Sequence, residues 1–239
     1  MSERKPLIAA NWKMNEPPVE CCTPESPYRS TDNVDVWVFP SFINLHCCCD
    51  NGLITGAQYG HASDQGAHTG DVSMKMIADQ KHHAVLCGHS ERRQYHYETD
   101  AFVAEQVESA LKHGLHPVIC VGESAEEREA GKEKQVVQTQ VEAVLSKCED
   151  AEVTFAYEPV WAIGTGNTAT PDDAEEMHAF IRSLLPHPDT SRIIYGGSMK
   201  PENAEELLKM PNIDGGLVGG ASLIPEQFQE MIATAEKLV

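Results

Sequence analysis

The chain has 239 residues and a formal net charge of −19, because 37 acidic residues stand against 18 Lys and Arg. This charge argues against nucleic-acid binding, since the phosphates would be repelled. No stretch approaches the roughly 20 apolar residues of a membrane helix. The N-terminus lacks the apolar run of a signal peptide, because charged Glu3, Arg4 and Lys5 lead straight into a strand-length segment. We therefore expect a soluble, cytoplasmic protein that has neither a membrane nor a nucleic-acid partner.

From residue 5 onward, short apolar runs alternate with amphipathic segments. The apolar runs predict strands at 7–10, 34–39, 53–58, 85–88, 118–121, 153–157, 193–195 and 216–218. Helical spacing follows several of these runs, as in the face that Val103, Val107 and Ala110 share. Pro201 and Pro225 suit the first turn of a helix, and Thr170 suits a cap.

Alternating strands and helices imply parallel strands joined by right-handed crossovers. Eight such units with no linker-like stretch predict an α/β protein in which residues 1–239 form a single domain, a closed (β/α)8 barrel. An open doubly wound sheet is the alternative. It would not gather polar residues from the first, fourth, sixth and eighth strands at one place.

The first third of the chain departs from this regularity. Residues 16–33 should supply the first outer helix, but they contain Pro17, Pro18, Pro24 and Pro27, which oppose a long helix. The helix after Phe42 must also be short, because Asn-Gly at 51–52 turns the chain into the next strand. The sequence does not show what compensates for the missing helix.

Cysteines are numerous, with eight in the chain. The runs Cys21-Cys22 and Cys47-Cys48-Cys49 are adjacent residues rather than the C-x-x-C pairs of zinc sites, and no histidine pair follows at metal spacing. We predict no metal and no cofactor, and we interpret the runs as free thiols that are prone to oxidation.

The apolar run 153–157 ends in a carboxylate, Glu158, and Pro159 follows at once. A paired central strand cannot continue through that proline. The loop that follows contains the aromatic Trp161 and the glycines Gly164 and Gly166. A carboxylate at a strand end, beside such a loop, suggests a base beneath a closing lid at 159–169. An ordinary strand-to-helix connection with a solvent-facing Glu is the alternative.

Five stretches, in the same order along the chain, resemble the motifs of the triosephosphate isomerase family. They are Asn11-Trp12-Lys13, 88–93 (Gly-His-Ser-Glu-Arg-Arg), 156–170, 195–198 (Tyr-Gly-Gly-Ser) and 217–223. The resemblance covers essentially the whole chain and implies a TIM barrel. It also implies interconversion of dihydroxyacetone phosphate and D-glyceraldehyde 3-phosphate through an enediol, a reaction of glycolysis and gluconeogenesis.

The resemblance also implies roles for the residues at the strand ends. Glu158 would be the base that moves the proton between carbons, and His89 the electrophile, neutral at the positive end of a helix that begins at Ser90. This use of a neutral histidine comes from the family resemblance and not from the residues alone. Lys13 and Asn11 would bind the substrate and stabilise charge on its oxygen. Glu91 would anchor one of them, although a direct proton role is the alternative.

The phosphate group would bind where backbone amides are accessible. Gly219 and Gly220, after the eighth strand, let main-chain amides approach an anion closely. Ser198 and Gly164 would complete the phosphate site, as the resemblance implies. A closed loop 159–169 would exclude water and retain the enediol.

The polar loop 59–71 resembles the arm by which one subunit of the family enters its neighbour. Thr69 would then support the partner's Asn11 and Glu91, and the active enzyme would be a homodimer. A mobile surface loop on a monomer is the alternative.

Two alternatives to the isomerase are another phosphate-binding barrel enzyme and a non-catalytic scaffold. A sugar-phosphate aldolase or phosphoribosyl isomerase needs a Schiff-base lysine on a strand, or acid and base residues at other strand ends, and the sequence offers neither. A non-catalytic scaffold would usually have lost the base, the electrophile or the lysine, whereas Glu158, His89 and Lys13 are all present.

Overall fold

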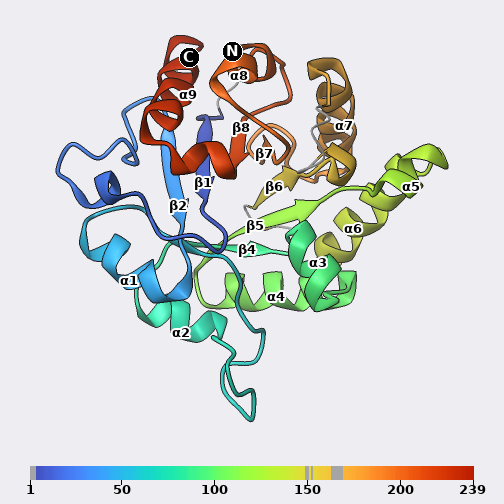
Figure 1. Ribbon diagram of the computed structural model, residues 1–239. Helices are drawn as coiled ribbons and strands as arrows, with labels where there is room; N and C mark the ends of the chain where they lie inside the picture. The colour runs from blue at the N-terminus through green and yellow to red at the C-terminus, as the bar shows by residue number, and fades with distance from the viewer. Residues whose placement is uncertain (1–3, 149–150, 152, 163–168) are drawn as a thin grey trace.

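The computed structural model describes residues 4–148, 151, 153–162 and 169–239. Within them, eight parallel strands form one sheet in the order β2-β1-β8-β7-β6-β5-β4-β3. The strands are β1 (Leu7–Asn11), β2 (Asp35–Phe39), β3 (Gly56–Ala57), β4 (Ala84–Cys87), β5 (His116–Val121), β6 (Thr154–Tyr157), β7 (Arg192–Tyr195) and β8 (Gly215–Val218). The helices lie outside the strands, as Figure 1 shows.

The two end strands of the sheet, β2 and β3, lie next to each other, so the sheet forms a nearly closed barrel. Val38 forms an isolated parallel bridge with Thr55, and its amide donates to the carbonyl of Ile54 over 2.9 Å. The predicted (β/α)8 barrel is thus confirmed. The third strand is shorter than predicted. The sequence predicts a strand at 53–58, but only Gly56 and Ala57 pair with β4.

The α-helices alternate with the strands. They are α1 (Phe42–Asp50), α2 (Met74–Asp79), α3 (Ser90–His96), α4 (Asp100–Lys112), α5 (Ala125–Glu129), α6 (Glu133–Cys148), α7 (Pro171–Leu184), α8 (Pro201–Leu208) and α9 (Pro225–Lys237). The predicted starts are confirmed: Thr170 caps α7 by accepting the Asp173 amide, and prolines open α8 and α9. Among the described residues, no helix has the length and apolar character needed to cross a membrane.

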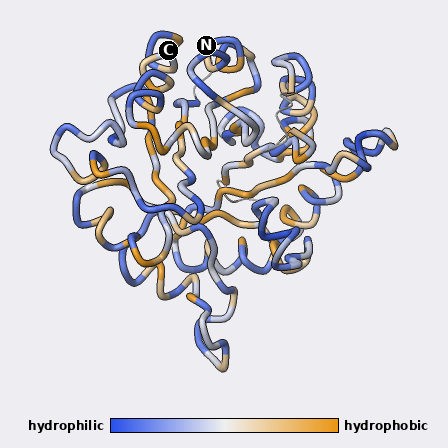
Figure 2. The backbone as a smooth tube through the Cα atoms, viewed as in Figure 1, coloured by the Kyte–Doolittle hydropathy of each residue, from blue (hydrophilic) through white to orange (hydrophobic). Residues whose placement is uncertain are grey.

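The apolar side chains pack in two layers on either side of the strands. Along β1, Leu7 and Ala9 belong to the cluster inside the barrel, while Ile8 and Ala10 belong to the larger cluster that packs with the helices. This alternation follows from the two-residue period of a strand. Both faces are apolar, so the strands appear as hydrophobic segments in Figure 2.

The proline-rich segment forms no α-helix, as predicted, and contains only the short 3-10 helix η1 (Val19–Cys22). A buried aromatic residue fills the space instead. The Tyr28 ring stacks on Phe228 of α9, with 4.9 Å between centroids, and meets Trp12 edge-on at 5.2 Å. Its hydroxyl donates to the carbonyl of Ser222 over 2.7 Å. Tyr28 therefore attaches this segment to the end of the chain and compensates for the missing helix.

His178, on α7, is a fully buried histidine outside the pocket at the strand ends. Its Nδ1 lies 3.3 Å from the carbonyl of Asn212, and its Nε2 has no hydrogen-bond partner among the residues that the structure describes. Burial is the main cause that lowers the pKa of His178 from 6.5 to about 3. The folded state therefore holds the imidazole neutral at pH values where the unfolded chain protonates it.

This difference predicts acid destabilisation. Because the unfolded state binds the extra proton, the stability that neutral His178 confers is complete above pH 6.5 and is lost as the pH falls toward 3. At about pH 5 the loss should be about 2 kcal/mol for this residue. Urea unfolding at pH 7 and pH 5, at one protein concentration, would measure it. In His178→Gln the decrease between the two pH values should be smaller by that amount, and an unchanged decrease would contradict the prediction.

Candidate active site

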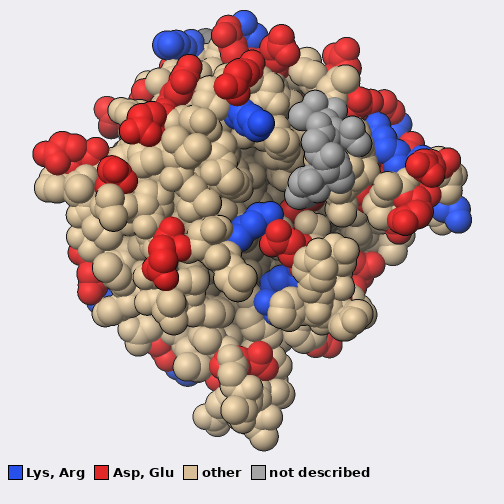
Figure 3. All heavy atoms as spheres, viewed as in Figure 1, with Lys and Arg blue, Asp and Glu red and all other residues tan. Residues whose placement is uncertain are grey.

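A pocket of about 1080 Å³ opens at the carboxyl ends of the strands. Figure 3 shows the molecule hollowed near the centre of one face, with basic side chains at the hollow and many acidic ones around the rim. The pocket is lined by every predicted site residue that the structure describes, namely Asn11, Lys13, His89, Glu91, Glu158, Ser198, Gly219 and Gly220. The predicted site residue Gly164 lies outside the described residues.

Glu158 directly follows β6 and is only 2% exposed. One of its carboxylate oxygens accepts the backbone amide of Ser90 over 2.8 Å, and the other accepts the Ser90 hydroxyl over 3.2 Å. Two glycines make room for it. A Cβ on Gly122 would lie 1.7 Å from the Glu158 carbonyl oxygen, and one on Gly196 would lie 2.8 Å from its Cγ. The sequence indicated the carboxylate but not Ser90 as its partner.

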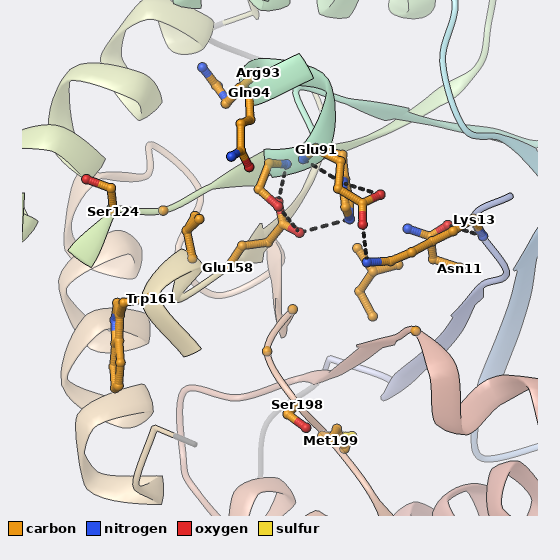
Figure 4. A pocket seen from close by; sticks show the side chains of 18 of the residues that line it. Asn11, Lys13, Glu91, Arg93, Gln94, Ser124, Glu158, Trp161, Ser198 and Met199 are labelled. Atoms are coloured by element: carbon orange, nitrogen blue, oxygen red, sulfur yellow. Dashed lines mark hydrogen bonds and ion pairs between the residues drawn. The ribbon is translucent and has the colours of Figure 1, made fainter. Parts of the chain in front are cut away.

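His89 caps the N-terminus of α3, as expected of a helix that begins at Ser90. Its Nδ1 accepts the backbone amide of Glu91 over 3.2 Å. An accepting Nδ1 carries no proton, so the neutral imidazole holds its proton on Nε2. That nitrogen lies 3.0 Å from the Glu158 carboxylate, and both residues line the pocket, in which Figure 4 labels Glu158.

The contact between these two groups sets their protonation. Burial raises the pKa of Glu158, but the adjacent His89, the Ser90 amide and the Lys13 charge outweigh it, and the pKa is lowered. Burial lowers the pKa of His89, but the Glu158 carboxylate outweighs it, and the pKa is raised. The sequence led us to expect a carboxylate that acts as a base and a histidine that stays neutral. The opposite directions arise because, with no substrate between them, the two side chains are partners of each other.

Lys13 has a left-handed backbone, with φ of 51°, which is rare for a residue with a side chain. Two hydrogen bonds hold it there: its amide donates to Asn11 Oδ1 over 3.1 Å, and its carbonyl accepts Gln58 Nε2 over 2.8 Å. Its ammonium group forms an ion pair of 2.7 Å with Glu91. The predicted anchoring role of Glu91 thus has a matching contact, whereas Gln58 was missed by the sequence analysis.

The glycines after β8 line the same pocket as the residues of α3. An ideal Cβ on Gly219 would lie 3.5 Å from Cε of Lys13, so the lysine side chain passes close to this turn. Gly220 begins the 3-10 helix η3 (Gly220–Leu223), and the first amides of a helix have no acceptor within it. Backbone donors and an ammonium group therefore face one region of the pocket, together with Ser198 before α8.

The described start of the predicted lid is firmly held. Pro159 precedes the 3-10 helix η2 (Val160–Ala162), and residues 163–168 lie outside the described part of the chain. The fully buried carboxylate of Glu123 accepts the Trp161 indole N–H over 2.8 Å and the Tyr157 hydroxyl over 3.0 Å. Arg128 pairs with the same carboxylate at 3.1 Å. Glu123 was missed, although a carboxylate just after β5 is the same signal that Glu158 gives after β6.

Among the described residues, one group has the proximity needed to hold a metal ion. It comprises His61, His68 and Asp71, on the loop between β3 and α2 and outside the pocket. His61 Nδ1 accepts the amide of Ser63 over 3.0 Å, so the neutral ring carries its proton on Nε2, which lies 4.0 Å from Asp71. That arrangement leaves neither ring nitrogen of His61 with a lone pair for a metal.

The chain also matches known proteins over almost its whole length. The family model described as triosephosphate isomerase matches residues 6–235. A curated triosephosphate isomerase from Carboxydothermus hydrogenoformans is 47% identical, and the alignment covers 96% of this chain and 98% of the relative. Curated proteins of the same name from Chloroflexus aurantiacus and Rubrobacter xylanophilus are 45% and 44% identical, over 96% and 98% of this chain and 98% of each relative.

Catalytic side chains at the carboxyl rim of a closed parallel barrel are the defining arrangement of (β/α)8-barrel enzymes. Fold, pocket and sequence agree on this class. Within it, the chain belongs to the triosephosphate isomerase family.

The Glu158–His89 contact predicts a change in the titration of the histidine. In Glu158→Gln the carboxylate that favours imidazolium is gone, so the pKa of His89 should fall relative to the unchanged enzyme. NMR titration of the imidazole nitrogens would measure this, with His89→Gln to assign the signal. In the control Glu91→Gln the decrease should be smaller, because Glu91 lies farther from the ring, at 3.7 Å. An unchanged pKa in Glu158→Gln would contradict the contact.

Proposed function

We propose that this chain is a triosephosphate isomerase that interconverts dihydroxyacetone phosphate and D-glyceraldehyde 3-phosphate by proton transfer through an enediol. The observation that supports this most strongly is the meeting of a carboxylate with an imidazole of defined tautomer. Glu158 and His89 follow strands β6 and β4, and their reactive atoms lie 3.0 Å apart in a pocket that Lys13 also lines.

Glu158 is the proposed base. In the substrate-free pocket, hydrogen bonds from Ser90 and the contact with His89 hold its pKa down. When the carboxylate moves to the substrate carbon it gives up these contacts, and a closed loop 159–169 would exclude water from around it. Burial, which already raises its pKa, then becomes the larger effect, and the carboxylate becomes basic at the moment it must take a proton.

His89 is the proposed electrophile. Its Nε2–H points into the pocket because Nδ1 is occupied by the Glu91 amide. Once Glu158 turns to the substrate, that N–H is available to a substrate oxygen. It can polarise the carbonyl and then exchange its proton between the two oxygens of the enediol.

Asn11 and Lys13 are the proposed stabilisers of charge on oxygen. The Asn11 Oδ1 atom accepts the Lys13 amide, so the remaining polar group of Asn11, its NH₂, is the one that can donate to substrate. The Lys13 ammonium group lies between its partner Glu91 and the Gly219 turn. It can therefore attract both the enediolate and the phosphate, which backbone amides at Gly219 and Gly220 and the hydroxyl of Ser198 would also bind.

The first test is Glu158→Asp. The shorter carboxylate cannot reach the substrate carbon, so kcat should fall by about 10²- to 10⁴-fold while KM changes little. A coupled assay of glyceraldehyde 3-phosphate conversion would measure both constants, and circular dichroism would verify the fold. His89→Ala should also lose activity. A folded Glu158→Asp enzyme with near-normal turnover would remove Glu158 from the role of base.

We further propose that the active form is a homodimer assembled through the loop 59–71. Figure 1 shows this loop, between β3 and α2, projecting away from the barrel. Its base is fastened to α4: Gln106 donates to the carbonyl of Gly60 over 3.0 Å, and Ser109 to that of Ala62 over 2.8 Å. Its tip, residues 65–70, is exposed. A loop with a fixed base and an exposed tip is suited to insertion into a partner.

Large apolar side chains are exposed elsewhere on the chain. Met14 is 95% exposed and Ile43 is 83% exposed. The segments that contain them are adjacent, because Asn44 donates to Glu16 over 3.0 Å. Exposed apolar side chains that gather on a soluble protein are a sign of a contact surface, so these residues are the proposed place where a partner's loop would pack.

A charge at the tip of the loop tests the dimer. Thr69→Arg should block insertion into the partner, so sedimentation should find mainly monomer, and kcat/KM should fall by at least about tenfold because partner support of Asn11 and Glu91 is lost. The matched control is Ser183→Arg, which adds the same charge at an exposed position of α7 and should leave both readouts unchanged. Fully active monomers would overturn the proposal.

The cytoplasm is the proposed location. All eight cysteines are free thiols in this structure, which is the state expected in a reducing compartment.

A further inference from the structure

The pocket at the strand ends is lined by more carboxylates than cations among the described residues. The cations are Lys13, Arg93 and Lys200, and the carboxylates are Glu91, Glu126, Glu127 and Glu158. The molecule around it carries a net charge of −19, and Figure 3 shows many acidic side chains around the hollow. A phosphate dianion that enters this pocket therefore needs a positive charge that no carboxylate already compensates.

Two of the three cations are paired with carboxylates. Lys13 forms an ion pair of 2.7 Å with Glu91, and Arg93 forms one of 2.5 Å with Asp100. Lys200 is exposed and forms no ion pair with any residue that the structure describes. Among the described residues of the pocket, Lys200 is therefore the one cation whose charge is not compensated by a neighbour.

The turn that carries Lys200 is fixed by its neighbours. Met199 is 2% exposed and lies against Gly216 of β8, where an added Cβ would be 2.5 Å from the methionine sulfur. The Asn203 side chain accepts the Lys200 amide over 2.8 Å and donates to the carbonyl of Ser198 over 3.0 Å. Ser198 and Lys200, on either side of the buried methionine, both line the pocket. The backbone thus holds Lys200 at a fixed point of the pocket wall, two residues from a proposed phosphate ligand.

We propose that the charge of Lys200 attracts the phosphate group of the substrate into the pocket. This inference rests on the proposed isomerase function, because it assumes that the substrate is a dianionic phosphate ester. Lys200 acts on capture of the substrate and has no part in proton transfer. Its charge should therefore affect kcat/KM and leave kcat unchanged.

Lys200→Gln removes this charge and keeps a polar side chain. At low ionic strength kcat/KM should fall by about two- to fivefold, which is the effect of one charge acting on a dianion over roughly 10 Å of water. Salt screens that interaction, so the variant and the unchanged enzyme should approach the same kcat/KM at about 300 mM sodium chloride. Lys200→Arg keeps the charge and should match the unchanged enzyme.

The matched control is Lys209→Gln. Lys209 directly follows α8, lies outside the pocket and is paired with Glu205. This variant changes the net charge of the molecule by the same amount as Lys200→Gln. It therefore separates a local effect at the pocket from an effect of total charge, and its kcat/KM should stay close to that of the unchanged enzyme at every salt concentration.

The experiment has two readouts. The first is kcat and KM for glyceraldehyde 3-phosphate between about 10 mM and about 300 mM sodium chloride. The second is the Kd of inorganic phosphate, measured by isothermal titration calorimetry at low salt, which does not depend on turnover. In Lys200→Gln this Kd should rise by about the same two- to fivefold. A chain that shows this rise but does not convert the triose phosphate would contradict the proposed function and still support the role of Lys200.

Two results would overturn the proposal. The first is that Lys200→Gln and Lys209→Gln have the same kcat/KM and the same affinity for phosphate. The second is a decrease in kcat/KM that is equally large at all salt concentrations, because a lost contact and not a lost charge would then be its cause.

Discussion

Closure of the parallel sheet is the constraint on which the rest of this molecule depends. Parallel strands end at one rim, so closure brings residues from β1, β4 and β6 to a single pocket. The seam between β2 and β3 is the weakest part of the ring, since β3 has only two residues. Gln58 reinforces that seam by donating to the carbonyl of Phe39, and the same amide group donates to the carbonyl of Lys13 over 2.8 Å. One side chain therefore joins closure of the barrel to the strained backbone of a site residue.

The pocket illustrates how one buried carboxylate can have two electrostatic environments. Without substrate, Glu158 rests on the Ser90 amide and beside His89, and these contacts offset the cost of burying a charge. The proposed base is thus stored in a weakly basic position. Glu158 becomes a stronger base only when it leaves that position. Stronger resting contacts therefore make it harder for Glu158 to act as the base. Lys13 and Glu91 form a second ion pair in the same pocket, and Glu91 also lies 3.7 Å from His89.

Much of this was predictable from the sequence, because it follows from local pattern. Apolar periodicity located all eight strands, prolines in 16–33 excluded the first helix, and strand-end polar residues located the pocket. The parts that were missed depend on neighbours distant along the chain. Gln58 and Tyr28 act through contacts with segments that no local pattern connects to them. The pKa directions of Glu158 and His89 depend on a side-chain position, which a motif does not specify. Glu123 gave the same signal as Glu158 and could have been considered.

The distribution of charge has a consequence for how fast the proposed substrate arrives. The pocket holds its positive charge close to the surface, in Lys13 and backbone amides, while the molecule as a whole carries a net charge of −19. A phosphate ester that approaches from beyond the Debye length of about 10 Å is first repelled by the negative net charge of the molecule. It is attracted by the pocket only when it comes closer. Most enzymes with charged substrates lose association rate as salt screens their attraction. Here the net field to be screened is repulsive, so we expect dissolved salt to speed the arrival of the substrate.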